Sequence, residues 1–163
     1  MTHRPFLMWP DRRLRTSAAP VGEIDDAVRA IWEEMLEAMY AMPGVGLAAP
    51  QLGIMRRLAV VDAGDGSGPV RLADPVIVAA SEIPSEWDEG SPNLPGVRAT
   101  ITRPRAVTVA YTDHHGMRVR GEFVKLRATS VQHQIDHLDG RMFFDRLSKT
   151  KRDMLLRRAR KRA

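Results

Sequence analysis

The sequence predicts an α+β fold in which mostly antiparallel sheets pack around a central helix, with a basic helix at the C-terminus. Three observations carry this prediction. Apolar residues recur at helical spacing in residues 23–41, several β-like runs follow, and a second helix pattern covers residues 124–138. Helices that are segregated in the sequence from a run of strands are typical of α+β domains. A chain of 163 residues is long enough for one such domain with its own hydrophobic core.

The first elements are helical. Asp11 is placed to cap a short turn at residues 11–15. In the helix that follows, the apolar positions lie three or four residues apart and acidic residues lie between them. These apolar positions are Ile24, Val28, Ile31, Met35 and Met39. Pro43 and Gly44 end the helix, because proline cannot extend it and glycine favours the conformation of a helix end.

The strands are expected between the two helices. Residues 58–61 form an apolar run, and residues 70–80 form a longer one that contains Pro75. Proline lacks the amide hydrogen that a central strand needs, so Pro75 indicates an edge strand or a bend. Residues 106–111 and 117–123 flank a polar turn and are expected to form a β-hairpin.

The chain ends in a strongly basic segment. From Arg146 onward nine basic residues accompany one acid, Asp153, so this segment has a net charge of +8. The whole chain has a net charge of +5, so the remainder has a net charge of −3. We divide the chain into a domain at residues 1–147 and a basic helical tail at residues 148–163. The sequence has no apolar run long enough to span a bilayer and no apolar core of a signal peptide, so a cytoplasmic protein without membrane contact is expected.

The second predicted helix carries the most specific chemical pattern. His133 and His137 lie four residues apart, which places both imidazoles on one face of a helix, as two ligands of one metal ion require. In the His-Glu-x-x-His form of this pattern the glutamate is the general base. Gln134 stands at that position, and a carboxamide cannot carry the proton. The chain has no cysteine, which excludes disulfides and thiolate ligands.

Two further segments accompany this helix. Residues 44–51 read Gly-Val-Gly-Leu-Ala-Ala-Pro-Gln, and residues 89–96, which we expect to form a tight irregular loop, read Glu-Gly-Ser-Pro-Asn-Leu-Pro-Gly. Together with residues 132–140 they resemble, in order and spacing, the three signatures of the peptide deformylase family. That family removes the formyl group from the N-terminal methionine of new bacterial proteins. The resemblance covers nearly the whole domain, and it implies the family's fold and a divalent metal, zinc or iron.

The chain departs from the family pattern at three positions. Ser91 stands where the family has the cysteine that is its third metal ligand, and a neutral hydroxyl is a weak ligand. Pro92 stands where a backbone N–H helps to bind the oxyanion, and proline has none. Gln134 replaces the general base. We therefore expect metal binding at His133 and His137 to be weak or absent, with Ser91 a weak or lost ligand. Hydrolysis of N-formylmethionyl peptides is expected to be absent or strongly impaired.

The resemblance also implies a peptide-binding site. Gln51 matches the family's side-chain oxyanion donor, and Asp136 and Asp139 match acids of the metal-binding helix that support the site. The positions expected to contact a bound peptide are Gly44, Val45, Gly46, Pro92, Arg98 and Ser130. The nearby acids that could replace the missing ligand or base are Glu86, Asp88 and Glu89.

Three functional hypotheses follow. The main one is a degenerate, monomeric member of the family that binds peptide N-termini or the ribosome. The first alternative is an active metal-dependent peptide deformylase, or a related amide hydrolase, with a rearranged site that uses water and a nearby carboxylate. The second alternative is a non-enzymatic module that binds the ribosome or RNA. Family members dock on the ribosome through a C-terminal helix, and the lysines and arginines of the tail suit phosphate contacts. A solvated helix is the plain alternative for this tail.

Overall fold

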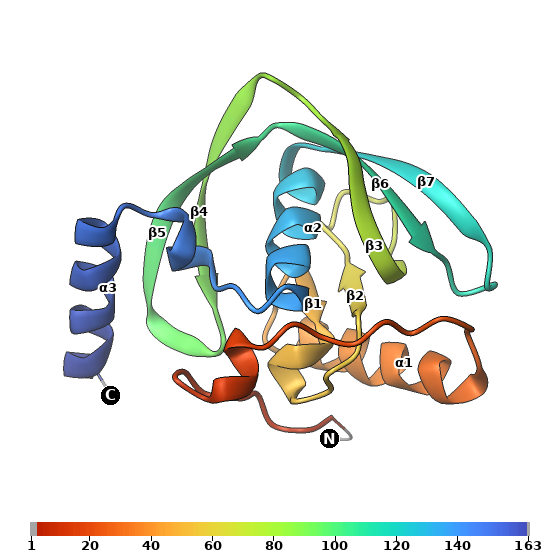
Figure 1. Ribbon diagram of the computed structural model, residues 1–163, viewed down its shortest axis with the longest axis horizontal. Coiled ribbons are helices and arrows are strands. Elements are labelled where there is room, and N and C mark those ends of the chain that lie inside the picture. Colours follow the sequence, from red (N-terminus) through yellow and green to blue (C-terminus); the bar gives the residue numbers. More distant parts are fainter. Residues whose placement is uncertain (1–2, 163) are drawn as a thin grey trace.

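The computed structural model describes residues 3–162 and confirms the α+β architecture (Figure 1). The helices are α1 (Asp26–Ala41), α2 (Lys125–Leu138) and α3 (Lys149–Arg162), and the short 3₁₀ turns are η1 (Arg12–Arg15), η2 (Ala49–Leu52) and η3 (Phe143–Arg146). The strands are β1 (Gly46–Ala48), β2 (Leu58–Val61), β3 (Val70–Ala80), β4 (Pro84–Ser91), β5 (Leu94–Pro104), β6 (Ala106–Thr112) and β7 (Arg118–Val124).

The strands form two antiparallel sheets with α2 between them (Figure 1). The larger sheet has the order β1-β2-β3-β6-β7, and β4 and β5 form a separate hairpin. The hydrophobic core is divided accordingly. One cluster joins α1 to β1 and β2, and another joins α2 to β2, β6 and β7. Both sheets therefore pack against helix α2, and its side chains are held in place by contacts with both sheets.

The two helices that the spacing predicts are present. Helix α1 begins at Asp26, three residues later than predicted, because Asp25 caps it by accepting from the backbone N–H of Val28 at 2.9 Å. Helix α2 begins within one residue of its predicted start, and all of residues 128–138 are buried. Many of these buried side chains are polar, and buried polar groups need partners inside the protein. The partners of α2 define the site described below.

Strand β3 bends at Pro75. Residues 70–73 pair with β2, whereas residues 76–80 pair only with β6, and the register shifts at the proline. The bend predicted from Pro75 is therefore present. Beyond the bend β3 has one neighbouring strand, so this half is an edge, which is where a missing amide hydrogen is tolerated.

Residues 89–96 do not form the irregular loop that we expected; that prediction is wrong. They are the closing end of the β4–β5 hairpin, in which Ser91 pairs with Leu94 across a two-residue turn. The hairpin buries the polar residues Glu89 and Ser91, so its strands lack the apolar alternation that marks a strand in a sequence. As a result, residues of the second signature stand on a rigid hairpin beside α2.

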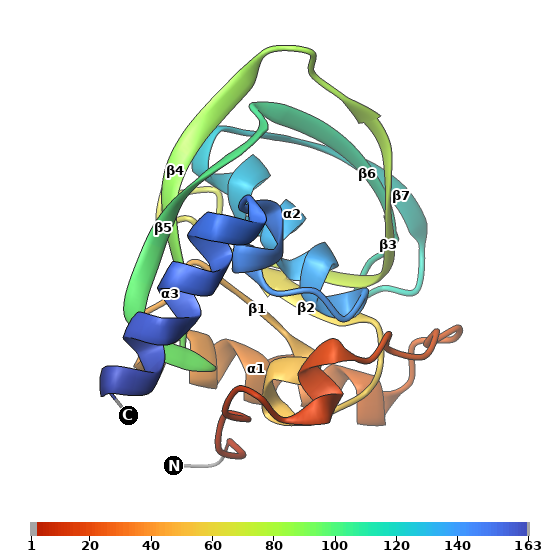
Figure 2. The same ribbon diagram turned by 60° about the vertical axis from the view of Figure 1, so that its left-hand side comes forward.

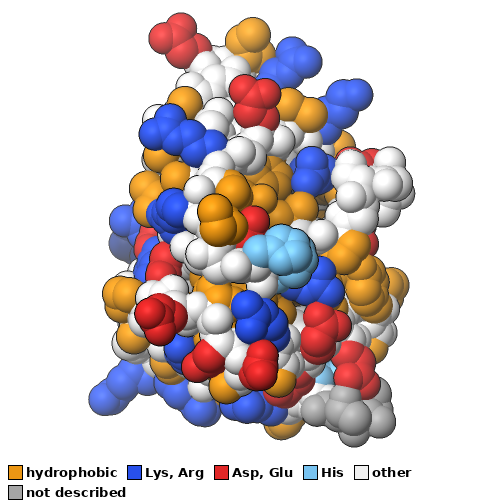
Figure 3. All heavy atoms as spheres, turned by 90° about the vertical axis from the view of Figure 1, so that its right-hand side faces the viewer, with side chains coloured by type: hydrophobic (Ala, Val, Ile, Leu, Met, Phe, Trp, Pro, Cys, Tyr) orange, Lys and Arg blue, Asp and Glu red, His pale blue; other side chains and the backbone are white. Residues whose placement is uncertain are grey.

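Helix α3 packs on β5 and η3 (Figure 2). Its Leu155 and Ala159 are buried in a hydrophobic cluster with Leu14, Ile101 and Phe143. Most of its basic side chains face solvent. The face of the molecule opposite α3 instead interleaves acidic and basic side chains (Figure 3). None of the helices in residues 3–162 has the length and apolar character needed to cross a membrane.

Candidate metal and substrate site

The two histidines of α2 converge on one point. Their Nε2 atoms lie 3.2 Å apart, and both side chains are buried. Two nitrogen ligands of one tetrahedral ion, each about 2.0–2.1 Å from it, are about 3.3 Å from each other. The spacing of His133 and His137 therefore fits a shared divalent cation, and it follows from their positions one helical turn apart.

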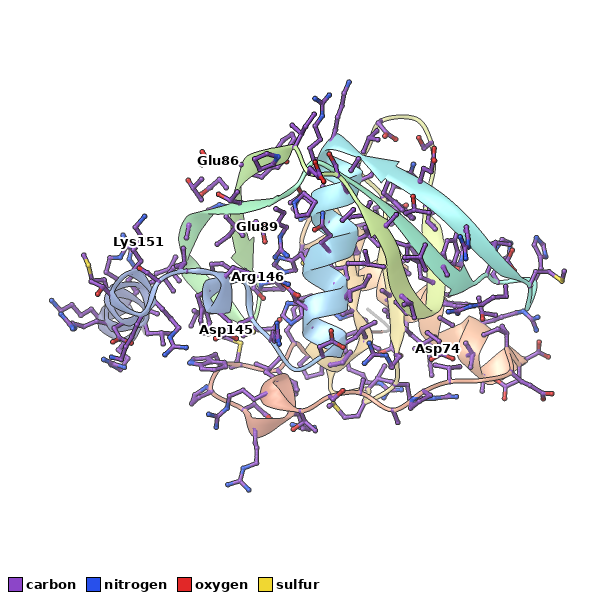
Figure 4. All side chains as sticks on the ribbon, turned by 45° about the horizontal axis from the view of Figure 1, so that its top comes forward. Asp74, Glu86, Glu89, Asp145, Arg146 and Lys151 are labelled. Carbon is purple, nitrogen blue, oxygen red and sulfur yellow. The ribbon has the colours of Figure 1, made fainter. Side chains whose placement is uncertain are left out.

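Glu89 orients the first of these rings. Its carboxylate lies 2.8 Å from Nδ1 of His133, and Arg103 donates to it from Nε at 2.8 Å and from Nη2 at 3.0 Å. A carboxylate on the far nitrogen of a metal-binding imidazole fixes the ring and raises its basicity. Figure 4 shows Glu89 pointing from β4 toward α2. Because Glu89 is hydrogen-bonded to both His133 and Arg103, it is not available to replace the missing base or ligand.

The partners of Glu89 also predict how stability depends on pH. Burial raises its pKa, but hydrogen bonds with His133 and Arg103 outweigh burial and lower the pKa from 4.5 to about 2. Such a group stabilises the folded state above its unfolded pKa, and this contribution is lost as the pH falls through the folded value. We expect the free energy of unfolding to fall between pH 4.5 and about 2. Urea denaturation of the metal-free protein over this range measures the slope. Glu89→Gln is expected to flatten it, and equal slopes in the two proteins would contradict the prediction.

A buried ion network ties α2 to the hairpin and to η3. Asp136 accepts from Nη1 of Arg103 at 2.9 Å and from Nη2 of Arg146 at 2.6 Å. Arg103 is 3% exposed, and two buried carboxylates balance its charge. Arg146 reaches toward α2 from η3 (Figure 4). Asp139 instead lies near the surface, where it pairs with Arg57. Of the two helix acids, Asp136 is thus the one that supports the site.

His137 is the more deeply buried ring, at 1% exposure. Burial, together with the neighbouring His133 and Arg103, holds the pKa of His137 well below the ordinary 6.5, so its imidazole is neutral. A metal ion needs the free lone pair of a neutral imidazole. Both the spacing and the protonation state of this ring are therefore those of a metal ligand.

A cavity of about 600 Å³ opens beside His133. Its walls are the segment before β1, the closing end of the hairpin and one side of α2. It brings together all of the predicted catalytic, peptide-contact and metal-binding residues except His137. Those lining it are Gly44, Val45, Gly46, Gln51, Ser91, Pro92, Arg98, Ser130, His133 and Gln134. His137 does not line the cavity, in keeping with its deeper burial.

Gly46 keeps one side of this cavity open. A Cβ atom at this position would lie 2.3 Å from the Ser130 hydroxyl and 2.6 Å from Nε2 of Gln134, so no side chain fits. Ser130 in turn donates to the carbonyl of Val45 at 2.9 Å and ties the start of β1 to α2. Strand β1 is the outer strand of the larger sheet, so its second edge remains available for a further strand.

Three residues of the site escape the sequence analysis. Asn93 lies inside the second signature and joins Gln51 to Ser91. Arg103 and Arg146 hold the two buried carboxylates, and nothing in their sequence surroundings marks them. The signature could have drawn attention to Asn93. The arginines become visible only when the hairpin and η3 pack against α2.

The donor set fits a divalent cation held by two imidazoles and a neutral oxygen. Within residues 3–162, no group of three His, Cys, Asp or Glu side chains is placed to hold a metal ion. The third position of the family's ligand set is Ser91, which lines the cavity with His133. Imidazole nitrogens suit zinc and iron, and an oxygen completes the set more weakly than a thiolate would.

The chain matches one family in sequence and in fold. A family model described as Polypeptide deformylase matches residues 3–153. The peptide deformylase of Rhizobium meliloti (strain 1021) is 43% identical over 161 residues, which are 97% of this chain and 92% of that protein. The peptide deformylase of Methylocella silvestris is 42% identical and covers 100% of this chain and 86% of its own length. The crystal structure of a peptide deformylase from Legionella pneumophila superposes with a TM-score of 0.90 at 38% identity, over 98% of this chain and 95% of that one.

These relatives overturn our expectation of a degenerate protein with absent or strongly impaired hydrolysis. That expectation rested on the combined changes at Ser91, Pro92 and Gln134. Proteins 40–43% identical over nearly the whole chain are nevertheless named peptide deformylase, which favours the active alternative with a rearranged site. The geometry agrees, because the paired histidines, the ion network and the cavity around the three altered positions are in place. The chain belongs to the peptide deformylase family, a family of hydrolases that use a divalent metal.

Proposed function

We propose that this protein is an active, metal-dependent peptide deformylase that hydrolyses the N-formyl group of peptides in a rearranged site. The observation that carries the proposal is the 3.2 Å approach of the His133 and His137 Nε2 atoms, next to a cavity that also presents Gln51. The buried network around Glu89 supports it. Buried charges are tolerated only when fully paired, and here the pairing fixes a ring that is placed to bind metal.

The histidines would hold a zinc or iron ion, with Ser91 as a third, neutral ligand. When bound, such an ion polarises a carbonyl and acidifies a water molecule. Gln51 lines the cavity and donates from Nε2 to the carbonyl oxygen of the substrate as negative charge develops there. One donor of this kind contributes about 3 kcal/mol to the transition state. Because Pro92 has no N–H, Gln51 provides this contribution without help from the hairpin backbone.

The substrate is a peptide that adds along the free edge of β1. Three features support this class of substrate: the outer position of β1, the open side at Gly46 and the apolar part of the cavity wall. Besides Val45 and Pro92, the apolar lining residues are Met42, Pro43, Trp87, Pro95, Val97 and Leu126. Such a lining suits the unbranched, apolar side chain of an N-terminal methionine.

Gln134 orients the attacking water, and a different side chain accepts the proton that this water loses. Its Oε1 atom is buried and has no hydrogen-bond partner in residues 3–162. Because Gln134 lines the cavity, a small rotation of its side chain would let this oxygen accept from a water molecule there. A glutamine orients the attacking water in this way in small GTPases. The proton then passes to Asp88, the remaining carboxylate of the cavity wall, which Arg98 holds by a 2.6 Å hydrogen bond.

Asp88→Asn tests this route for the proton. Because general base catalysis contributes on the order of 10²–10⁴-fold, we expect kcat to fall at least about tenfold. Glu86→Gln is the matched control, since Glu86 is an exposed carboxylate on the same strand and lies outside the cavity lining. Steady-state kinetics with a formyl-methionyl peptide measures the difference. Equal kcat values for the two variants would exclude Asp88 as the base.

Formate release tests the proposed function itself. The purified protein is reconstituted separately with Zn²⁺, with Co²⁺ and, without oxygen, with Fe²⁺, and is then given a formyl-methionyl peptide. We expect formate at a rate that is proportional to protein and is absent in His133→Ala. A protein that binds one metal ion per chain and still releases no formate above this blank would refute the proposal.

A second candidate function is contact between α3 and ribosomal RNA. The observation that favours it is that α3 packs through Leu155 and Ala159 and leaves a basic face in solvent. The exposed basic residues of this face are Lys149, Lys151, Arg157, Arg158, Arg160, Lys161 and Arg162. Phosphate contacts of this kind weaken steeply with salt.

Replacing Arg157, Arg158 and Arg160 together by alanine tests the contact. We expect co-sedimentation with ribosomes at low salt to be lost, because each arginine neutralises a phosphate. Formate release should be unchanged, since none of the three lines the cavity. The control replaces the exposed Arg12 of η1 and the exposed Arg120 of β7, which are not part of α3, by alanine. If the α3 variant still co-sediments with ribosomes, the proposed contact is wrong and α3 is a solvated helix.

A further inference from the structure

Asn93 occupies a fully buried position at the closing turn of the β4–β5 hairpin. Its Nδ2 donates to the carbonyl of Leu7 at 2.6 Å and to the carbonyl of Gln51 at 3.2 Å. Carbonyl oxygens can only accept hydrogen bonds, so these two contacts fix which end of the Asn93 amide is nitrogen. Its Oδ1 must therefore point the other way, toward the side chains of Gln51 and Ser91.

The side-chain amide of Gln51 is fixed in the same manner. Its Oε1 accepts from the backbone N–H of Ala48 at 2.9 Å, so Nε2 is at the opposite end. Nε2 donates one hydrogen to Oδ1 of Asn93 at 2.7 Å. Its only other contact in residues 3–162 is a long one of 3.4 Å to Ser91. The second hydrogen is thus held loosely at the wall of the cavity that Gln51 lines.

The hydroxyl of Ser91 has one hydrogen-bond acceptor within residues 3–162. The backbone N–H of Asn93 at 3.2 Å and Nε2 of Gln51 at 3.4 Å are both donors. Oδ1 of Asn93 at 2.9 Å is the only acceptor among its hydrogen-bond neighbours in residues 3–162. The proton therefore points to Asn93. One lone pair faces the Asn93 N–H, and the other is met only by the long Gln51 contact.

We propose that Asn93 is a positioning residue that sets the polarity of this wall, so that an N–H of Gln51 and an oxygen lone pair of Ser91, which meet only each other across 3.4 Å, are available to a ligand in the cavity. The proposal rests on the proposed function and deepens it. The N–H is placed for a developing oxyanion, and the lone pair is a neutral oxygen donor for the cation that the histidines hold. Without Asn93, the hydroxyl proton could turn toward the cation. A hydroxyl binds a cation through an oxygen lone pair, so a hydroxyl whose proton faces the cation cannot be a ligand.

The first test measures Co²⁺ affinity by competition with a chromophoric chelator, which needs no enzyme activity. Asn93→Ala is expected to bind Co²⁺ at least about tenfold more weakly than the native protein, within the range found for groups that orient metal ligands. In a Ser91→Ala background the same substitution should change the affinity less than about twofold, because it acts through Ser91. Equal effects in both backgrounds, or no effect in either, would overturn the proposal.

The second test separates positioning from support of the fold. Asn93→Asp keeps the acceptor for Ser91 and Gln51 and loses the two hydrogen bonds from Nδ2. It should lower Tm yet retain Co²⁺ affinity, whereas a merely structural residue would lose both together. Gln132→Ala is the control, since Gln132 also donates from a buried amide to two backbone carbonyls and does not line the cavity. It should lower Tm and leave Co²⁺ affinity unchanged.

Turnover provides the readout for Gln51. Asn93→Ala is expected to lower kcat at least about tenfold with a smaller change in KM, and the loss should shrink in a Gln51→Ala background. If neither Asn93 variant folds, native Co²⁺ affinity in Ser91→Ala or native kcat in Gln51→Ala still overturns the proposal. A protein that binds Co²⁺ through Ser91 and releases no formate refutes the proposed function and leaves the positioning role of Asn93 in place.

Discussion

His137→Ala is expected to abolish both metal binding and formate release. The two Nε2 atoms are 3.2 Å apart and the third donor is a neutral hydroxyl, so the loss of one imidazole leaves a single strong ligand. Metal assistance is worth several kcal/mol in the transition state, which corresponds to at least about 10³-fold in kcat/KM. The effect should exceed that of the same substitution in an enzyme with a thiolate ligand, because this site has no anionic donor to retain the ion.

Metal content after gel filtration and kcat/KM for a formyl-methionyl peptide measure this result. His114→Ala is the matched control, since His114 is an exposed histidine of the β6–β7 turn and does not line the cavity. Thermal unfolding shows whether the His137 variant is folded. A folded His137→Ala protein that keeps one ion per chain, or more than about a tenth of the native kcat/KM, would contradict the assignment of this ring as a ligand.

Arg103→Met is expected to destabilise the fold by about 3–5 kcal/mol. Arg103 is 3% exposed and binds Glu89 and Asp136, whose side chains are also buried. Methionine fills much of the space but leaves these two carboxylates without their shared counter-charge, and removing one partner of a buried ion pair is costly. Glu89 would also lose the group that holds it against His133, so metal affinity should fall along with stability.

The free energy of unfolding in urea measures the first effect, and chelator competition measures the second. Arg71→Met is the matched control, because Arg71 pairs with Glu33 at 2.8 Å where the glutamate is 65% exposed. Surface pairs contribute at most about 1 kcal/mol. If Arg103→Met costs no more than Arg71→Met, the network is not the element that holds the hairpin against α2.

The helices and the paired histidines could be predicted from the sequence because their geometry is local. A helix places residues four apart on one face whatever surrounds it, so the spacing of His133 and His137 was sufficient to expect converging rings. The proline in β3 likewise indicated a bend, since the missing amide hydrogen is a property of the residue itself. The first residue of α1 was predicted less accurately, because it depends on which side chain accepts a hydrogen bond from a free backbone N–H, and here that side chain is Asp25.

The β4–β5 hairpin could not be predicted in this way. Strand signals in a sequence come from apolar alternation, and this hairpin turns Glu89 and Arg103 toward α2. Their burial is possible only because each meets an opposite charge from another element. Pairing between distant elements leaves no local pattern, so nothing in the sequence singled out Arg103 and Arg146 or showed that Glu89 would pair with His133.

The expectation of lost hydrolysis rested on three substitutions taken together. Ser91, Pro92 and Gln134 each remove a known contribution, and the sum suggested a degenerate site. The close relatives named peptide deformylase contradict that conclusion. In the structure Ser91 is hydrogen-bonded to Asn93, and the buried side-chain oxygen of Gln134 has no hydrogen-bond partner in residues 3–162.

By itself, the sequence determined the fold class, the family and the pair of imidazoles, because helical spacing and ordered signatures are properties of the chain. Only the tertiary structure decided what surrounds that pair. The hairpin, η3 and α2 must pack before Arg103 can neutralise two buried carboxylates and before Asn93 can orient Gln51 and Ser91. Burial makes an unpaired charge or hydrogen-bonding group costly, and packing alone determines which groups become partners.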